Sequence, residues 1–186
     1  MSDLIGSVAV VTGAARGQGR THAVALAAEG ADIIAIDRCA DLDSIPYPLA
    51  TRADLDETVA AIEALGRRVV PVVADVRDLA QLTSAVQTGI DRLGEVDIVI
   101  ANAGVVAIGI SDPLDEQVYR DIVDTNLNGV WHTIAATVPR EELREDHIIP
   151  GVFNRIVPER VARAVRRTAV QTGAARLKHR SASFYR

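Results

Sequence analysis

The stretch Thr12-Gly13-Ala14-Ala15-Arg16-Gly17-Gln18-Gly19 decides the fold, because its glycines stand where an apolar run ends and an amphipathic one begins. The run Val8 to Thr12 predicts a strand, and Gln18 to Glu29 predicts a helix that ends at Gly30. Glycines at such a junction permit a tight turn, let the backbone approach a pyrophosphate, and let helix and strand pack closely. The stretch therefore predicts the phosphate-binding turn of a βαβ unit.

The same alternation of apolar and amphipathic segments continues along the chain. Further strands are predicted at Ile33 to Ile36, Val69 to Val73 and Asp97 to Ala101, and helices at about Asp54 to Leu65, Leu79 to Leu93 and Leu114 to Thr137. Right-handed crossovers place these strands in the order 3-2-1-4. We expect an α/β fold, a Rossmann-like doubly wound parallel sheet truncated after strand 4, with a helical C-terminal tail. The fourth strand is apolar on both faces, as buried parallel strands are.

Charge divides the chain into two unlike parts. Residues 1–138 carry 9 basic and 20 acidic side chains, a net charge of −11, whereas residues 139–186 carry 11 basic and 5 acidic ones, a net charge of +6. We therefore expect a nucleotide-binding Rossmann-like domain over 1–138 and a basic, mainly helical segment of different origin over 139–186.

Several classes of protein are disfavoured by the sequence. The N-terminal stretch has no basic region before its short apolar run, and no apolar run approaches the ~20 residues of a membrane span, so we expect a cytoplasmic protein. The single cysteine, Cys39, and four scattered histidines show no metal-ligand spacing, so no metal site is predicted. We expect neither a nucleic-acid nor a membrane partner.

The end of the second predicted strand bears on the choice of nucleotide. Asp37 follows the last glycine of the turn by 18 residues, where a carboxylate can accept hydrogen bonds from the adenosine ribose. A carboxylate there also repels a 2′-phosphate, which favours NAD over NADP, although the adjacent Arg38 would attract that phosphate.

Polar residues also follow the third and fourth predicted strands. Asp75 follows one, and Asn102-Ala103-Gly104 follows the other, so both lie at the carboxyl edge of the sheet, beside the point where the winding direction reverses. Asn126 lies inside an otherwise helical stretch together with Asn128 and Gly129, three residues that helix propensity disfavours. A functional asparagine and a surface asparagine both fit that pattern.

Together these segments resemble the short-chain dehydrogenase/reductase family over residues 6–139. The segment DRCADLDSIPYPLAT, which starts at Asp37, resembles the insertion of carveol-dehydrogenase-like members that work with mycofactocin and hold NAD between turnovers. The resemblance implies that the pyrophosphate is contacted by Gly13, Arg16, Gly17, Gln18 and Gly19. It implies that Asp37 and Arg38 contact the ribose, and that Asp75 and Val76 contact the adenine. It implies nicotinamide contacts from Asn102, Ala103 and Gly104, and Asn126 as the catalytic-helix asparagine. It implies small alcohols or ketones as substrates.

The chain departs from that family in its catalytic residues. The family uses a serine and a Tyr-x-x-x-Lys motif, but the single lysine is Lys178 and the residue four before it is Ala174. Beyond Asn126 the serines are Ser181 and Ser183, close to the C-terminus. Since losing a positioned acid/base costs ~10²–10⁴-fold in rate, we expect the chain to retain NAD(H) binding although its catalysis is impaired.

Residues 145–176 resemble the C-terminal tail of bacterial malic enzymes, and the chain therefore reads as a hybrid. Three hypotheses remain open at this point: a catalytically impaired oxidoreductase, a non-catalytic NAD-binding sensor or partner module, and a poorly folding hybrid fragment. An exposed edge on the fourth strand, or the long helix, could also pair two copies of the chain.

Overall fold

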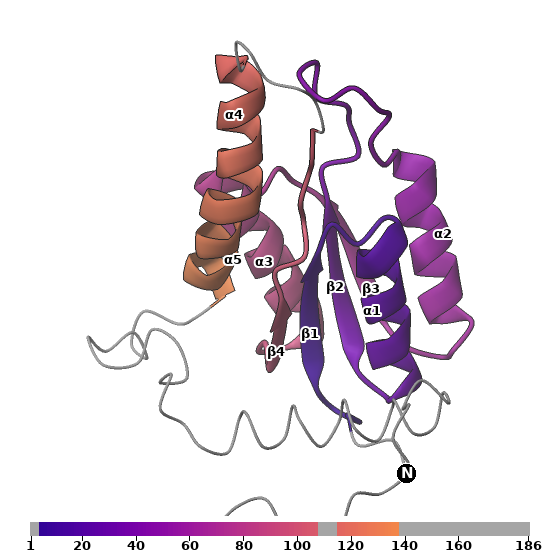
Figure 1. The fold of residues 1–186 in the computed structure, drawn as a ribbon. Helices are drawn as coiled ribbons and strands as arrows, with labels where there is room; N and C mark the ends of the chain where they lie inside the picture. The colour runs from indigo at the N-terminus through magenta and orange to yellow at the C-terminus, as the bar shows by residue number, and fades with distance from the viewer. Residues whose placement is uncertain (1–3, 108–114, 138–186) are drawn as a thin grey trace, which may run out of the picture. The chain divides into compact units, whose positions relative to one another are not determined.

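A parallel four-stranded sheet organises the protein. The computed structural model describes residues 4–107 and 115–137, all within the unit Met1–Pro139. The strands are β1 (Val8–Thr12), β2 (Asp32–Asp37), β3 (Val69–Val73) and β4 (Ile98–Ile100), in the order β3-β2-β1-β4 (Figure 1). This is the predicted order. Because the winding reverses between β1 and β4, the sheet has a ligand-binding switch point at their carboxyl ends.

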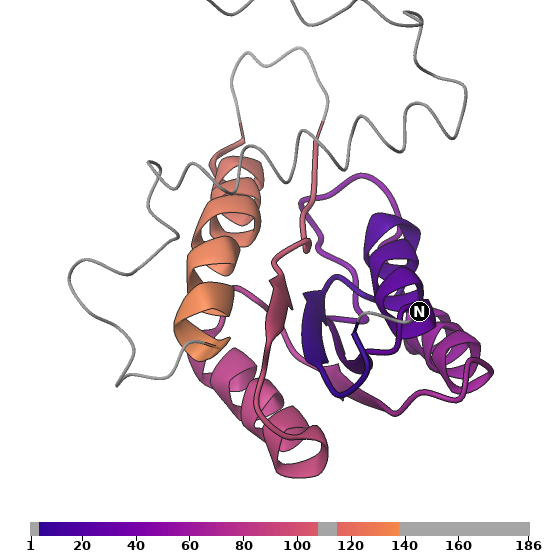
Figure 2. The same ribbon diagram turned by 90° about the horizontal axis from the view of Figure 1, so that it is seen from below.

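Helices cover both faces of the sheet, as Figures 1 and 2 show. One face carries α1 (Gly17–Ala28) and α2 (Arg52–Glu63). The other carries α3 (Leu79–Leu93), α4 (Glu116–Val123), the π-helical turn η1 (Asp124–Asn128) and α5 (Gly129–Thr137). The two-sided covering confirms the doubly wound α/β fold.

Alternate residues of the central strands build two apolar cores. Ala9 and Val11 of β1 pack with Leu55 and Ile62 of α2, whereas Val8 and Val10 belong to the core formed with α3. Successive side chains of a strand point to opposite faces, so β1 and β2 are buried on both sides. This burial holds the strand ends, and the loops after them, in fixed positions.

A buried carboxylate fastens the start of β2 to the segment before β3. Asp32, 2% exposed, accepts hydrogen bonds from Arg67 Nη2 at 2.5 Å and from Arg68 Nε at 2.7 Å. Burial raises the pKa of Asp32, but the hydrogen bonds from Arg68 and the charges of both arginines outweigh it, so the pKa lies below its ordinary value. The ionised form therefore stabilises the fold.

Two sequence-based expectations need correction. The predicted single helix from Leu114 to Thr137 is interrupted by η1, because one extra residue enters the helix at Asp124–Asn128. The strand predicted over 97–101 is shorter and is not buried on both faces: Val99 is 36% exposed, since β4 forms an edge of the described sheet.

Some expectations fall outside the described residues. The predicted C-terminal segment, 139–186, and its resemblance to malic enzymes lie there entirely. Within residues 4–107 and 115–137, no helix is both long and apolar enough to cross a membrane. The predicted cytoplasmic location stays a prediction.

Candidate functional site

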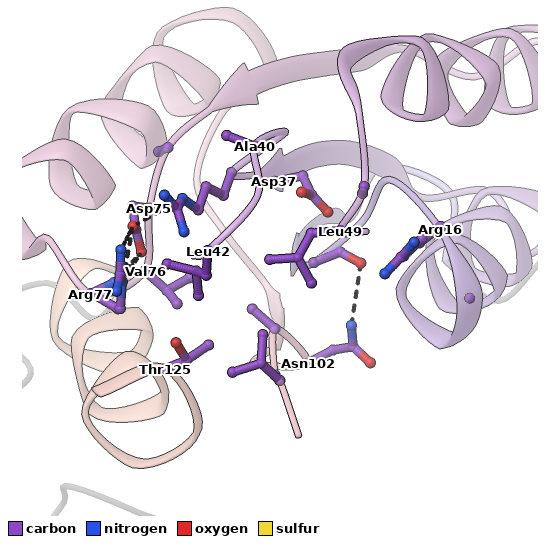
Figure 3. Close-up of a pocket in the computed structure, with 18 of the residues that line it drawn as sticks. Arg16, Asp37, Ala40, Leu42, Leu49, Asp75, Val76, Arg77, Asn102 and Thr125 are labelled. Carbon is purple, nitrogen blue, oxygen red and sulfur yellow. Dashed lines mark hydrogen bonds and ion pairs between the residues drawn. The ribbon is translucent and has the colours of Figure 1, made fainter. Parts of the chain in front are cut away.

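A pocket of about 340 Å³ opens at the carboxyl ends of the strands (Figure 3). It is lined by eleven of the twelve residues predicted to contact the cofactor: Gly13, Arg16, Gly17, Gln18, Asp37, Arg38, Asp75, Val76, Asn102, Ala103 and Gly104. The remaining one, Gly19, is buried beneath the turn. Residues up to 91 positions apart in the chain thus meet at the switch point, where open α/β sheets bind ligands.

The glycine-rich turn has no room for side chains at two of its positions. Gly13 has a φ of +66°, and a Cβ there would lie 2.9 Å from the Cα of Ala103. A Cβ on Gly19 would lie 1.9 Å from the carbonyl oxygen of Gly13. The N-cap Arg16 makes no side-chain cap hydrogen bond at the start of α1, and Gly17 and Gln18 at that end of the helix line the pocket. This is the arrangement that receives an anion at a helix N-terminus.

Asp37 ends β2 with its carboxylate fixed by the backbone. Oδ2 accepts a hydrogen bond from Ala15 N at 3.0 Å, and Oδ1 accepts one from Cys39 N at 3.0 Å. These bonds tie the phosphate-binding turn to the end of β2 and orient the carboxylate on the pocket wall. Each oxygen keeps a further lone pair for a ligand hydroxyl.

Asp75 is the centre of an ionic network at the end of β3. Its carboxylate accepts hydrogen bonds from Arg77, including one of 2.8 Å between Oδ2 and Nη2, and lies 3.4 Å from Arg38 Nε. Burial raises the pKa of Asp75, but the hydrogen bonds and charge of Arg77 and the charge of Arg38 bring it below the ordinary value. Asp75 is therefore held as a carboxylate.

The same network reaches α4 through Asp121. Arg77 forms an ion pair with the buried Asp121 carboxylate, which also accepts a hydrogen bond from Ser44 Oγ at 2.6 Å and one from Gln117 Nε2 at 3.1 Å. The Ser44 hydrogen bond is the main reason that the pKa of Asp121 lies below its ordinary value. No sequence pattern predicts this role for Arg77.

Asn102 joins the ends of β1 and β4. Its side-chain amide donates to the carbonyl oxygen of Thr12 at 3.0 Å and to that of Gly13 at 3.4 Å. Figure 3 draws the contact with Gly13. In return, the Thr12 hydroxyl accepts hydrogen bonds from the backbone N–H of Asn102 and Ala103. These bonds fix the mouth of the switch point, with Gly104 on its wall.

Asn126 lies in the π-helical turn and contacts the segment after β4. Its Nδ2 donates to the carbonyl oxygen of Val105 at 2.8 Å, and its Oδ1 accepts from the Val105 N–H at 2.9 Å. The side chain therefore holds the segment that follows Gly104, and Asn126 is not itself among the residues that line the pocket. A π-helical turn inside an α-helix is a feature often found at functional sites.

Residues 39–50, here called the strap, supply one wall of the pocket. Leu42 and Leu49 line it, as Figure 3 shows. The strap is fastened at three points: Arg16 Nη2 donates to Pro48 O at 2.9 Å, Tyr47 Oη accepts from Val106 N at 2.9 Å, and Ser44 bonds to Asp121.

Burial raises the pKa of the Cys39 thiol in this segment to about 11, so the thiol is protonated near neutral pH.

Two polar atoms in the pocket wall are buried without a hydrogen-bond partner among the described residues. They are Arg38 Nη1 and Thr125 Oγ1. Thr125 lies in η1, is 7% exposed, and was missed by sequence reasoning because a threonine inside a helical pattern gives no distinctive signal. Buried polar groups are normally paired, so both atoms point to a polar ligand.

Sequence reasoning also missed the lining residues Ala40, Leu42, Leu49, Ala50, Ala74, Arg77 and Val105. Those in the strap come from the segment that the family resemblance had marked. Within the described ranges, no group of three or more histidine, cysteine, aspartate or glutamate side chains could hold a metal ion.

Comparison with known proteins gives the context of this site. The family model "short chain dehydrogenase" matches residues 7–149, ten residues beyond the resemblance expected from the sequence. (-)-trans-Carveol dehydrogenase of Rhodococcus erythropolis is 45% identical over 152 residues, covering 81% of this chain and 52% of its own. An uncharacterized NAD-dependent oxidoreductase of Mycobacterium tuberculosis is 51% identical over 137 residues, covering 73% of this chain and 50% of its own.

A solved structure is similar as well. Carveol dehydrogenase from Mycobacterium avium in complex with NAD has 50% sequence identity and a TM-score of 0.71, and the match covers 73% of this chain and 50% of that one. The chain thus spans about half the length of the relatives it matches. The family model, the parallel sheet and these relatives agree, and this chain belongs to the short-chain dehydrogenase family.

Proposed function

We propose that this chain binds NAD(H) at the switch point between β1 and β4, as the nucleotide-binding part of an oxidoreductase for secondary alcohols and ketones. The observation that carries the proposal is the pocket, in which the glycine turn, Asp37, Asp75 and Asn102 line one continuous wall. Relatives whose names include NAD support the choice of cofactor.

The residues present fit a dinucleotide. Gly13 and Gly19 keep the backbone bare where a pyrophosphate would approach the start of α1, and a Cβ at either position would collide with backbone. Arg38 Nη1 and Thr125 Oγ1, which find no partner within residues 4–107 and 115–137, offer hydrogen bonds that a polar ligand can complete. In this proposal the glycine turn holds the pyrophosphate, Asp37 the ribose, and Asp75 and Val76 the adenine.

The proposal prefers NAD to NADP. The Asp37 carboxylate is held in place by Ala15 N and Cys39 N, so it cannot turn away from a 2′-phosphate without losing both bonds. Arg38 is engaged by Asp75, which reduces its attraction for that phosphate. We expect NADH to bind at least 10-fold more tightly than NADPH, and equal affinities would contradict the assignment of Asp37.

The substrate class comes from the relatives. Carveol dehydrogenases are similar to this chain at 45% and 50% identity, which supports secondary alcohols and the corresponding ketones. NAD accepts a hydride in such oxidations, and a protein acid/base normally takes up the hydroxyl proton. This 186-residue chain has no Tyr-x-x-x-Lys motif to do so. We therefore propose that it binds the cofactor and is catalytically impaired, with Asn126 surviving from the catalytic helix.

Two measurements test the proposal. Calorimetric titration of the full chain with NADH should give micromolar binding, and no binding at millimolar NADH would remove every NAD-dependent function. An assay with NAD and a panel of terpenoid and aliphatic secondary alcohols should give turnover well below ~10 s⁻¹, the median for enzymes. Turnover near that median would show that the chain is not impaired.

The absence of a Tyr-x-x-x-Lys motif from the sequence also favours a second candidate, a non-catalytic sensor or partner module that uses NAD(H) as a structural ligand. The two candidates differ in activity at saturating cofactor: any NAD-dependent oxidation above the uncatalysed rate favours the impaired enzyme. A chain that binds no nucleotide and melts over a broad range would instead be the poorly folding fragment.

We also propose that two copies of the chain associate through α4, η1 and α5. Large apolar side chains on this stretch are exposed: Tyr119 is 55%, Leu127 66% and Trp131 59% exposed. Exposed apolar patches mark interaction sites. Light scattering should detect a dimer, and Trp131→Glu should shift it toward the monomer, whereas a monomeric wild-type chain would exclude the interface.

A further inference from the structure

We propose that the hydroxyl of Thr125 is a specificity contact for the adenine base of the bound nucleotide. The inference rests on the proposed NAD(H) site and adds to it a residue on η1, at the opposite side of the pocket from the glycine turn. It starts from the observation that Thr125 Oγ1 is buried and has no hydrogen-bond partner among the described residues.

The hydroxyl faces the pocket. Thr125 is 7% exposed, and it lines the pocket together with Val76 and Leu42. Figure 3 shows its hydroxyl turned toward these two side chains. Leaving a buried hydroxyl unpaired is unfavourable, so the position favours a ligand that can complete the bond.

Two contacts fasten this part of the helix to the end of β3. A Cβ on Gly129 would lie 2.7 Å from Val76 Cγ2, so the glycine permits a close approach. His132 Nδ1 lies 2.8 Å from the Val76 carbonyl oxygen, at hydrogen-bond distance. Thr125 is therefore held near Val76, at the end of the pocket that the proposed function gives to the adenine.

The surroundings suit a planar base with polar atoms on its edge. Leu42 and Val76 supply apolar surface for the faces of the ring, and a threonine hydroxyl both donates and accepts. The edge of adenine carries an amino donor and ring-nitrogen acceptors that such a group can pair with. Arg38 Nη1, which also lacks a partner in the described part of the chain, adds a second donor to the same ligand.

Thr125→Val is the test, because valine keeps the shape and removes the hydroxyl. In the full chain, we expect NADH to bind about 3- to 10-fold more weakly, the loss of one neutral hydrogen bond. ADP, which contains adenosine but no nicotinamide, should be weakened by the same factor in competition with NADH. Thr125→Ser should restore binding to within twofold of the wild type.

Stability separates this contact from a structural role. Since no described residue bonds to the hydroxyl, Thr125→Val should leave the melting temperature without ligand unchanged or raised. Thr133→Val is the matched control: Thr133 is fully buried, outside the pocket lining, and bonds to Gly129 O at 2.7 Å. That variant should melt earlier and keep its affinity for NADH and ADP.

Each other outcome overturns the inference or the proposed function on which it rests. Unchanged binding in Thr125→Val overturns the inference alone, and so does a loss for NADH with none for ADP, which would place the contact at the nicotinamide half. A wild-type chain that binds neither nucleotide overturns the proposed function. If Thr125→Val does not fold, Thr125→Ala provides the same comparison, and a folded Thr125→Ala with wild-type affinity for both ligands contradicts the contact.

Discussion

The side-chain amide of Asn126 pairs with both backbone groups of Val105, through bonds of 2.8 Å and 2.9 Å. This pair joins the π-helical turn η1 to the segment that leaves β4. Val105 lines the pocket and Asn126 does not, so the asparagine positions a residue of the pocket wall without lining the pocket itself. The relationship explains why an amide, which carries both a donor group and an acceptor group, is present at this position.

Replacing Asn126 should affect stability and binding together. Asn126→Ala leaves the N–H and carbonyl of Val105 unpaired, which should cost about 2 kcal/mol of unfolding free energy and weaken NADH binding. Asn126→Asp retains the acceptor for the Val105 N–H but sets a carboxylate oxygen against the Val105 carbonyl oxygen, so it should also destabilise the fold. Urea unfolding and fluorescence titration measure both effects. Asn128→Ala is the control, because its exposed side chain bonds only to Asp124 among the described residues, and its effect should stay within ~0.5 kcal/mol.

Adding a methyl group to the phosphate-binding turn should prevent nucleotide binding. A Cβ at Gly19 would lie 1.9 Å from Gly13 O, so Gly19→Ala must displace the turn. We expect a loss of NADH affinity of at least 100-fold. Gly66→Ala serves as the control: its φ of +71° strains an alanine by ~1–2 kcal/mol, but the added Cβ meets nothing within 4 Å. It should melt earlier and bind NADH normally. Normal binding by Gly19→Ala would remove the turn from the site.

The strap should slow the release of the nucleotide. Tyr47 Oη accepts a hydrogen bond from Val106 N, and Tyr47→Phe removes that bond alone. Losing a bond worth ~0.5–1.5 kcal/mol should speed NADH dissociation about 2- to 10-fold, as stopped-flow displacement would measure. Tyr119→Phe is the matched control, because Tyr119 is 55% exposed on α4 and does not line the pocket. Equal dissociation rates in the two variants would mean that the strap does not retain the ligand.

Acid should destabilise the fold through its paired carboxylates. The pKa values of Asp32, Asp75 and Asp121 lie below the ordinary value of about 3.9, so near that pH the unfolded chain binds more protons than the folded one. Their contribution is complete above about pH 5 and is lost as the pH falls through the lowered values.

Asp32→Asn tests that linkage. The variant should lose about 1–3 kcal/mol at pH 7, because the arginine partners of Asp32 keep some exposure to solvent, and less at pH 3. Urea midpoints at the two pH values measure the difference. A loss that is the same at both pH values would assign the effect to packing instead of charge.

The sequence by itself determined the strands, their order and the glycine turn. Val8–Thr12, Val69–Val73 and Leu79–Leu93 were predicted with the observed bounds, because apolar periodicity and glycines are local signals. It also identified the residues of the pocket wall at the strand ends, since the handedness of the crossovers brings those ends to one edge.

Tertiary structure alone decided what closes the pocket. The pairing of Asn126 with Val105 and the ionic network of Asp75, Arg77 and Asp121 join positions that are far apart along the chain. The Thr125 hydroxyl, which lacks a partner among the described residues, lies within a regular helical pattern. The π-helical turn has the same origin: Asn126 within it bonds to Val105, and Gly129 directly after it lies close to Val76, contacts that no local propensity encodes. Periodicity reports which face of an element is buried, whereas the partners of a polar group depend on the packing of the whole fold.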